Sequence, residues 1–118
     1  MKVVLDTNAL MAPFEYRINI DMEIQRNLGH PDIYVPSCVL GELRKLSSRR
    51  WEARAALKLA QKYRAVDVQS PGDSGVIEAA KKLNAHVITN DQELIKKLKK
   101  EKIPVLYVSQ NHLVMLND

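Results

Sequence analysis

Short apolar runs alternate along this chain with segments whose apolar residues recur every three or four positions. The runs are typical of buried strands, and the spaced pattern is typical of helices with one buried face. We predict strands at residues 2–5, 32–35, 65–68, 86–89 and 104–108, and a final edge strand over 112–116. Helices are predicted over residues 19–28 and 51–64, and three more begin near residues 37, 73 and 90.

Residues that favour turns and helix caps stand between these segments. Gly29 and Pro31 end the helix that begins at Asn19, because both residue types interrupt a helix. Ser37 and Asp73 occupy positions where a side-chain N-cap is expected. These caps support the predicted alternation of strands and helices.

The alternation of strands and helices predicts the fold class. Sequential strands joined by helices form mostly parallel sheets, with right-handed crossovers and helices on both faces. We therefore expect an α/β three-layer sandwich that spans residues 1–118 as a single domain. In such sheets ligands bind beyond the carboxyl ends of the strands, where the strand order reverses.

The composition and charge of the chain limit its possible partners and location but do not identify its function. The chain has 118 residues and a formal net charge of +4, which permits nucleic acid as a partner without requiring it. Its single cysteine, Cys38, cannot form an internal disulfide, and no apolar run is long enough to span a membrane. We expect a soluble, cytoplasmic protein with no membrane partner.

Four acidic residues, far apart in the sequence, follow or adjoin predicted strands. They are Asp6, Glu42, Asp73 and Asp91. If the carboxyl ends of the strands bring them together, they cannot all stay ionised without a compensating cation. Oxygen ligands favour Mg²⁺ or Mn²⁺, and such ions can activate water for hydrolysis of a phosphodiester bond.

Each of these acids also has a purely structural interpretation. Asp73 and Asp91 precede helices and could serve only as N-caps. Asp6 could form a turn at the end of a strand, and Glu42 could face solvent from its helix. Only the four acids taken together favour a metal site.

Basic residues gather between positions 44 and 64, where eight lysines and arginines stand against one acid. The four nearest to Glu42 are candidates for a track that binds the phosphates of a nucleic acid: Arg44, Lys45, Arg49 and Arg50. The alternative is an ordinary solvated helix face. In the helix over 51–64, a stripe that includes Trp51 and Tyr63 is expected to pack into the core or against a partner rather than to stack on bases.

Four motifs in order resemble those of PIN-domain nucleases. They are residues 4–10, residues 36–43, Asp73 ahead of residues 79–83, and residues 87–94. The resemblance implies a five-stranded parallel sheet in the order 3-2-1-4-5. It also implies that Asp6, Glu42, Asp73 and Asp91 are the catalytic, metal-binding acids.

The resemblance implies three supporting residues as well. Asn8 matches the polar residue after the first acid, and Thr89 matches a small hydroxyl residue that supports the site. Where many relatives have a further Asp, this chain has Glu93. A longer side chain at that position bears on how a second metal ion would be held.

By this resemblance the chain is a ribonuclease that uses Mg²⁺ or Mn²⁺ to hydrolyse RNA. It looks most like compact archaeal proteins related to ribosomal-RNA processing, and more distantly like VapC toxins. Two alternatives stay open: a toxin held inactive by an antitoxin, and a non-catalytic module that binds RNA or a ribosome-assembly protein. The resemblance also implies a homodimer.

Overall fold

The computed structural model describes residues 1–116. Its strands are β1 (Lys2–Leu5), β2 (Asp32–Pro36), β3 (Arg64–Val66), β4 (His86–Ile88), β5 (Val105–Ser109) and β6 (His112–Met115). Its helices are α1 (Thr7–Tyr16), α2 (Ile20–Leu28), α3 (Ser37–Leu46), α4 (Trp51–Ala60), α5 (Gly72–Leu83) and α6 (Gln92–Lys100).

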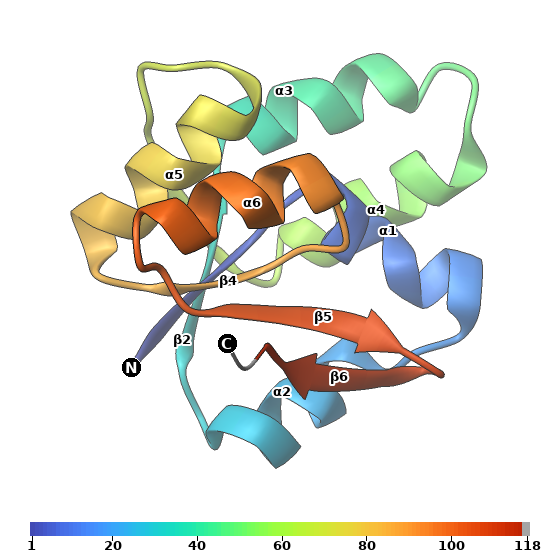
Figure 1. Cartoon of the computed structure of the whole chain (residues 1–118). Coiled ribbons are helices and arrows are strands. Elements are labelled where there is room, and N and C mark those ends of the chain that lie inside the picture. The colour runs from blue at the N-terminus through green and yellow to red at the C-terminus, as the bar shows by residue number, and fades with distance from the viewer. Residues whose placement is uncertain (117–118) are drawn as a thin grey trace.

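The strands form one sheet in the order β3-β2-β1-β4-β5-β6. Neighbouring strands from β3 to β5 pair in parallel, and β6 pairs antiparallel with β5. Figure 1 shows β5 and β6 side by side and pointing in opposite directions. The predicted α/β class, the order of the first five strands and the edge strand are confirmed.

The sheet is therefore not limited to five parallel strands. Gln110 and Asn111 adopt left-handed backbone conformations, with φ of 51° and 65°, and reverse the chain between β5 and β6. Two successive left-handed residues suit a tight hairpin turn. The hairpin adds an antiparallel sixth strand to the parallel sheet.

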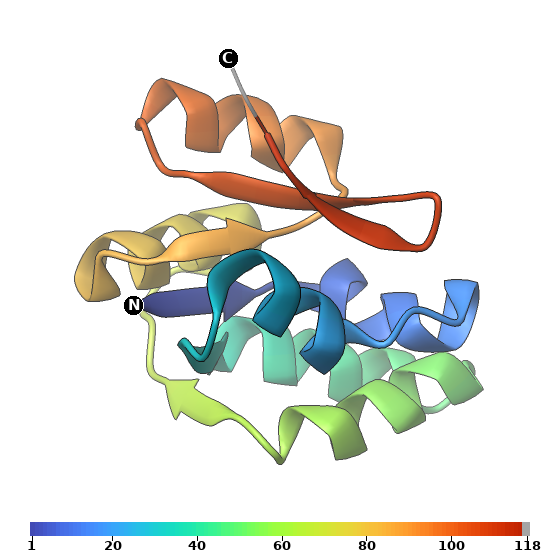
Figure 2. The same ribbon diagram turned by 90° about the horizontal axis from the view of Figure 1, so that it is seen from below.

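Helices cover both faces of the sheet. Figure 2 shows α2 in front of the sheet and α5 and α6 behind it. On the α5 side, α3 contacts both β2 and α5, while α1, α3 and α4 contact one another. The chain leaves β1 for β2 and β3 on one side and returns to β4 on the other, so the strand order reverses between β1 and β4.

The central strands are buried on both faces. Val3, Val4 and Leu5 in β1 and Val87 in β4 are fully buried. A parallel sheet covered by helices on both sides needs apolar residues at consecutive positions, which explains the short apolar runs of the sequence. Asp6, which follows β1 directly, is therefore a polar residue at the end of a strand that is shielded from solvent on both faces.

Helix α1 follows β1 at once and is missing from the sequence-based prediction. Its buried residues are the consecutive run from Ala9 to Ala12, so no spacing of three or four is visible. Pro13 lies inside the helix, where proline normally argues against one. The helix forms because Asp6 caps it and because α3 and α4 pack against it.

The predicted buried stripe of α4 is only partly correct, because Leu59 and Tyr63 pack against the core but Trp51 does not. The helix buries Ala53, Ala56 and Ala60, whereas Trp51 is 55% exposed. Small side chains on this face allow α4 to pack closely on α1 and α3. Trp51 consequently lies outside the core that it was expected to join.

The end of α4 differs from the prediction as well. The helix ends at Ala60, and β3 begins at Arg64, where the helix was predicted to end. Tyr63, between them, is half-buried against the core, and its hydroxyl donates a hydrogen bond to Asp21 at 2.5 Å. The interpretation of Tyr63 as a packing residue agrees with this position.

Two predicted helix caps are replaced by prolines. Pro36 and Pro71 occupy the N-cap positions of α3 and α5, and neither position has a side-chain cap. The hydroxyl of Ser37 instead accepts a hydrogen bond from the Val68 amide at 3.0 Å and so ties α3 to the chain after β3. Asp73 is thus free of a capping role.

None of the helices in residues 1–116 has the length and apolar character needed to cross a membrane.

Candidate functional site

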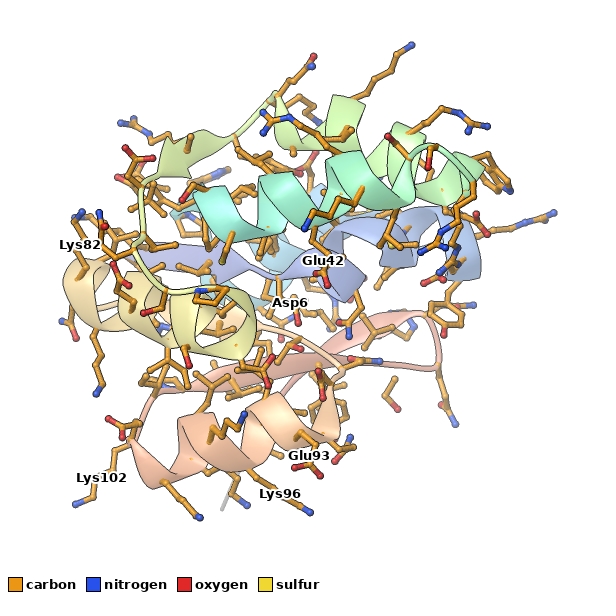
Figure 3. The ribbon with its side chains drawn as sticks, turned by 90° about the horizontal axis from the view of Figure 1, so that it is seen from above. Asp6, Glu42, Lys82, Glu93, Lys96 and Lys102 are labelled. Carbon is orange, nitrogen blue, oxygen red and sulfur yellow. The ribbon has the colours of Figure 1, made fainter. Side chains whose placement is uncertain are left out.

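A cavity of about 600 Å³ opens beyond the carboxyl ends of β1 and β4, where the strand order reverses. Its lining includes all four acids singled out in the sequence: Asp6, Glu42, Asp73 and Asp91. They come from the end of β1, from α3, from the first turn of α5 and from the start of α6. Figure 3 shows Asp6 and Glu42 near one another in the middle of this face of the molecule.

Asp6 is the most buried of these acids, with 6% of its surface exposed. Its carboxylate accepts hydrogen bonds from the Ala9 amide at 2.9 Å and from the Thr89 hydroxyl. Burial raises the pKa of Asp6 to about 7, although these two bonds act in the opposite direction. The nearby carboxylates of Asp91 and Asp73 raise the pKa further, so the cavity disfavours a negative charge on Asp6.

Glu42 is an exposed residue of α3, and it lines the cavity. Its Oε1 atom accepts a hydrogen bond from the hydroxyl of Thr7, at the start of α1. The bond joins two segments that are 35 positions apart in the sequence. It fixes the carboxylate of Glu42 on the same side of the sheet as Asp6.

Asp73 lines the cavity from the first turn of α5, and Asp91 lines it from the start of α6. The carboxylate of Asp73 lies 3.3 Å from the Nζ atom of Lys97, an α6 residue. Asp91 is the N-cap of α6, and its Oδ1 atom accepts hydrogen bonds from the amides of Glu93 at 3.0 Å and Leu94 at 3.4 Å. Asp91 thus has the structural role suggested by its position and also faces the cavity.

The three supporting residues differ in their placement. Thr89 is fully buried, and its hydroxyl donates to Asp6 while it accepts a bond from the Asp91 amide at 3.0 Å. Asn8 lines the cavity and accepts a bond from the Asn90 amide at 3.0 Å. Glu93 does not line the cavity; it is exposed on α6, where it pairs with Lys96 at 3.7 Å. Glu93 therefore lies outside the group of acids that faces the cavity.

The four basic residues of the predicted track divide into two pairs. Lys45 and Arg50 line the cavity, whereas Arg44 and Arg49 are in the same segment but outside its lining. Arg50 pairs with Glu15 at 2.9 Å. Within residues 1–116, Arg44, Lys45 and Arg49 form no ion pair.

Thr7 and Lys97 are contacts of the acids that the sequence did not reveal. Thr7 belongs to the first motif and lies between Asp6 and Asn8, and this position is the only feature of the sequence that links it to the site. Lys97 belongs to a run of lysines near the end of α6, where positive charges generally interact favourably with the helix dipole, so its sequence position does not point to the site. Only the packing of α6 beside α5 shows that its Nζ atom reaches Asp73.

The donor atoms of the cavity suit a hard divalent cation. In the part of the chain that the structure describes, no three His, Cys, Asp or Glu side chains form a ready-made ligand cage. Mg²⁺ needs no such cage, because proteins usually hold it by one or two carboxylates together with waters and substrate phosphates. A cysteine nucleophile is disfavoured, since burial raises the pKa of the Cys38 thiol at the cavity wall.

Comparison with known proteins relates the chain to one family. The family model described as "PIN like domain" matches residues 3–111. Ribonuclease VapC9 of Archaeoglobus fulgidus is 35% identical, in an alignment that covers 96% of this chain and 87% of that protein. Ribonuclease VapC4 of Methanocaldococcus jannaschii is 36% identical, with 92% and 91% of the two chains covered.

A similar fold is found among solved structures. The PIN domain endonuclease Utp24 superposes with a TM-score of 0.83 at 23% identity, over 97% of this chain and 90% of that chain. At this identity the similarity establishes the arrangement of helices and strands.

Proposed function

This chain belongs to the PIN-like domain family, and on that premise we propose that it is a metal-dependent endoribonuclease. The observation that carries the proposal is the convergence of Asp6, Glu42, Asp73 and Asp91 on one cavity. A module that only binds phosphates would gain nothing from clustered carboxylates, because they repel a polyanion. A cation-dependent reaction on that polyanion does require them.

In the proposed reaction the four acids hold Mg²⁺ or Mn²⁺ and the substrate is RNA. When bound, a divalent cation supplies activation of the attacking water and stabilisation of the leaving oxygen. The chain's own groups position the ligands: the Thr89 hydroxyl and the Ala9 amide hold Asp6, and the Thr7 hydroxyl holds Glu42.

Lys97 balances the charge of Asp73 in the protein without metal. Its side chain is more than half exposed, so it can leave Asp73 at little energetic cost. We therefore expect Asp73 to be available to a cation. Lys45 and Arg50 line the cavity, and we expect them to bind the phosphates on either side of the bond that is cut.

The first test is cleavage of single-stranded RNA by the parent chain and by Asp6→Asn. We expect cleavage with Mn²⁺ or Mg²⁺, none in EDTA, and none by the variant. Asp67→Asn is the matched control, because Asp67 is an exposed aspartate outside the cavity lining. Activity in EDTA, or equal activity of Asp6→Asn, would contradict the metal mechanism.

Processing of ribosomal RNA is the biological role that we propose first. The identity of 35% to a protein named Ribonuclease VapC9 favours a second role, that of a toxin restrained by an antitoxin. Both roles act on RNA, and for both we expect the protein in the cytoplasm. Expression of the chain alone separates them: a toxin arrests growth unless Asp6 is replaced by Asn, whereas a processing enzyme leaves growth unchanged.

A further inference from the structure

Trp51 is an exposed aromatic residue that the proposed reaction does not use. It is the only tryptophan of the chain and is 55% exposed at the start of α4. Tryptophan is enriched at interfaces, because its ring offers a large apolar surface together with one polar N–H group. The core does not need this ring, since α4 packs through its alanines.

One neighbour restrains the ring of Trp51. Phe14 of α1 meets it edge to face, with ring centroids 6.3 Å apart and planes at 74°. Such a contact favours one orientation of the indole. Because the ring is also more than half exposed, much of its surface is available to a flat group from outside.

Trp51 stands next to the wall of the cavity. Arg50, which precedes it, and Glu15, which follows Phe14, both line the cavity and pair with each other at 2.9 Å. The end of α1 and the start of α4 thus contribute both two residues of the cavity wall and the aromatic pair. A strand that enters the cavity past Arg50 would reach the indole within the length of a nucleotide or two.

The charge around Trp51 indicates the kind of ligand. Arg49 and Arg54 flank it as exposed residues, and Glu52 is the only acid between positions 44 and 64. Lys45 and Arg49 form no ion pair within residues 1–116 and remain available to phosphates. Arg50, which precedes Trp51, is paired with Glu15 and Glu52, so Lys45 and Arg49 carry the positive charge that phosphates can reach. Proteins that bind single-stranded nucleic acid combine aromatic rings with such cations.

We propose that Trp51 is a stacking platform for an unpaired base of the RNA, on the strand whose phosphates pass Lys45 and Arg50 into the cavity. The proposal rests on the proposed ribonuclease function and adds a preference for single-stranded over double-stranded substrate. Bases in a duplex are already stacked on one another, so they cannot cover the indole. The sequence predicted instead that Trp51 packs into the core or against a partner; its exposure contradicts packing into the core and leaves a protein partner as the competing outcome.

The fluorescence of the single tryptophan tests this contact directly. The chain with Asp6→Asn, which keeps the RNA intact, is titrated in EDTA with three probes: a short oligoadenylate, an abasic oligomer of equal length and charge, and a blunt RNA duplex. We expect the oligoadenylate to quench Trp51, and the abasic oligomer and the duplex to leave its emission nearly unchanged. Equal quenching by the abasic oligomer, or no quenching by oligoadenylate, would overturn the proposal.

The second test of the proposal measures the affinity of the chain and its variants for labelled oligomers. Trp51→Ala should weaken binding of oligoadenylate about tenfold, the loss expected for one stacked base, and leave the abasic oligomer unaffected. Trp51→Phe should recover part of the loss, and Met22→Ala, which removes another exposed apolar side chain, should change neither probe. Equal losses for both probes would mean that Trp51 acts only through the fold.

Cleavage assays separate this inference from the function on which it rests. Selective quenching without cleavage in Mn²⁺ would keep the stacking site and reject the nuclease. Cleavage without quenching, and with full activity of Trp51→Ala, would keep the nuclease and reject the stacking site. In that case the exposed indole of Trp51 would be expected to contact a protein partner, such as an antitoxin.

Discussion

Asp6 and Glu23 expose similarly small fractions of their surfaces to solvent, yet the pKa values of their carboxyl groups are shifted in opposite directions. Their exposed fractions are 6% and 7%. Burial raises the pKa of Asp6 to about 7, and neighbouring carboxylates add to the effect. The pKa of Glu23 is lowered to about 2, chiefly by the hydrogen bond from Arg26 and then by that from the Leu113 amide.

The surroundings of Glu23 explain its low pKa. Its Oε1 atom accepts bonds from Arg26 and from the Leu113 amide, both at 2.7 Å, and His112 lies 3.4 Å from Oε2. Asn27, one turn later on α2, donates to the Leu113 carbonyl at 3.0 Å. Glu23 therefore fastens the antiparallel edge strand β6 to α2, and its charge is balanced within the chain.

The charge of Asp6 has no such balance within the chain. Its partners are a hydroxyl and an amide, and the charged groups that affect its pKa are two further carboxylates. A buried acid surrounded by acids is costly unless a cation arrives from outside. Comparison of the two residues thus separates a carboxylate used for structure from one that is suited to bind a ligand.

The largest expected effect is on catalysis. Asp6→Asn should lower the rate of RNA cleavage at least about 100-fold, the upper range for loss of a group that merely supports a metal ligand. Glu23→Gln should keep most of the activity at a temperature where the variant is folded. If both substitutions lowered the rate equally, the assignment of a structural role to Glu23 and a ligand-binding role to Asp6 would be contradicted.

The next effect is on stability. Glu23→Gln replaces a charged acceptor by a neutral one and should lower the free energy of unfolding by about 1.5 kcal/mol in denaturant titrations. Glu101→Gln is the matched control, because its exposed pair with Lys81 is expected to contribute less than about 1 kcal/mol. A loss as small as that of the control would mean that Glu23 does not hold β6.

Acid should reproduce the effect of Glu23→Gln in the parent chain. The pKa of Glu23 falls from 4.5 to about 2 on folding, so its stabilisation is complete above pH 4.5 and is lost as the pH falls toward 2. The difference in unfolding free energy between parent and variant should shrink over that interval. A difference that stays constant from neutral pH to pH 2 would contradict the low pKa.

A smaller effect is expected at Thr89, which holds Asp6 in place without facing the substrate. Thr89→Val preserves the shape of the side chain but removes the hydroxyl that donates to Asp6 and accepts from the Asp91 amide. We expect cleavage to fall about tenfold and half-maximal activity to require more Mn²⁺. An unchanged Mn²⁺ requirement would show that Thr89 contributes only to packing.

Much of this arrangement could be predicted from the sequence. Val3 to Leu5 and the later apolar runs have the appearance of buried strands, and their alternation with helices predicts a mostly parallel sheet. The order of the strands in that sheet was implied only by the resemblance to PIN-domain nucleases. Since parallel strands end at one edge, acids that follow them were expected to meet there. The structure places Asp6 and Asp91 at that edge and brings Glu42 and Asp73 into the same cavity.

Other features depend on contacts that no local pattern encodes. Helix α1 buries four consecutive residues, so its period is hidden. Trp51 is exposed because α4 turns its alanines, rather than its tryptophan, toward the core. Glu23 gave no signal at all, because its partner Leu113 is 90 positions away and donates through the backbone.

The most direct test of the central claim is Mn²⁺ binding, measured by calorimetry on the parent chain, Asp6→Asn and Glu23→Gln without RNA. We predict that the parent and Glu23→Gln bind Mn²⁺ with the same affinity, and that Asp6→Asn binds it at least about tenfold more weakly. Equal binding by Asp6→Asn, or loss of binding in Glu23→Gln alone, would contradict the assignment of the cation to the cavity at Asp6.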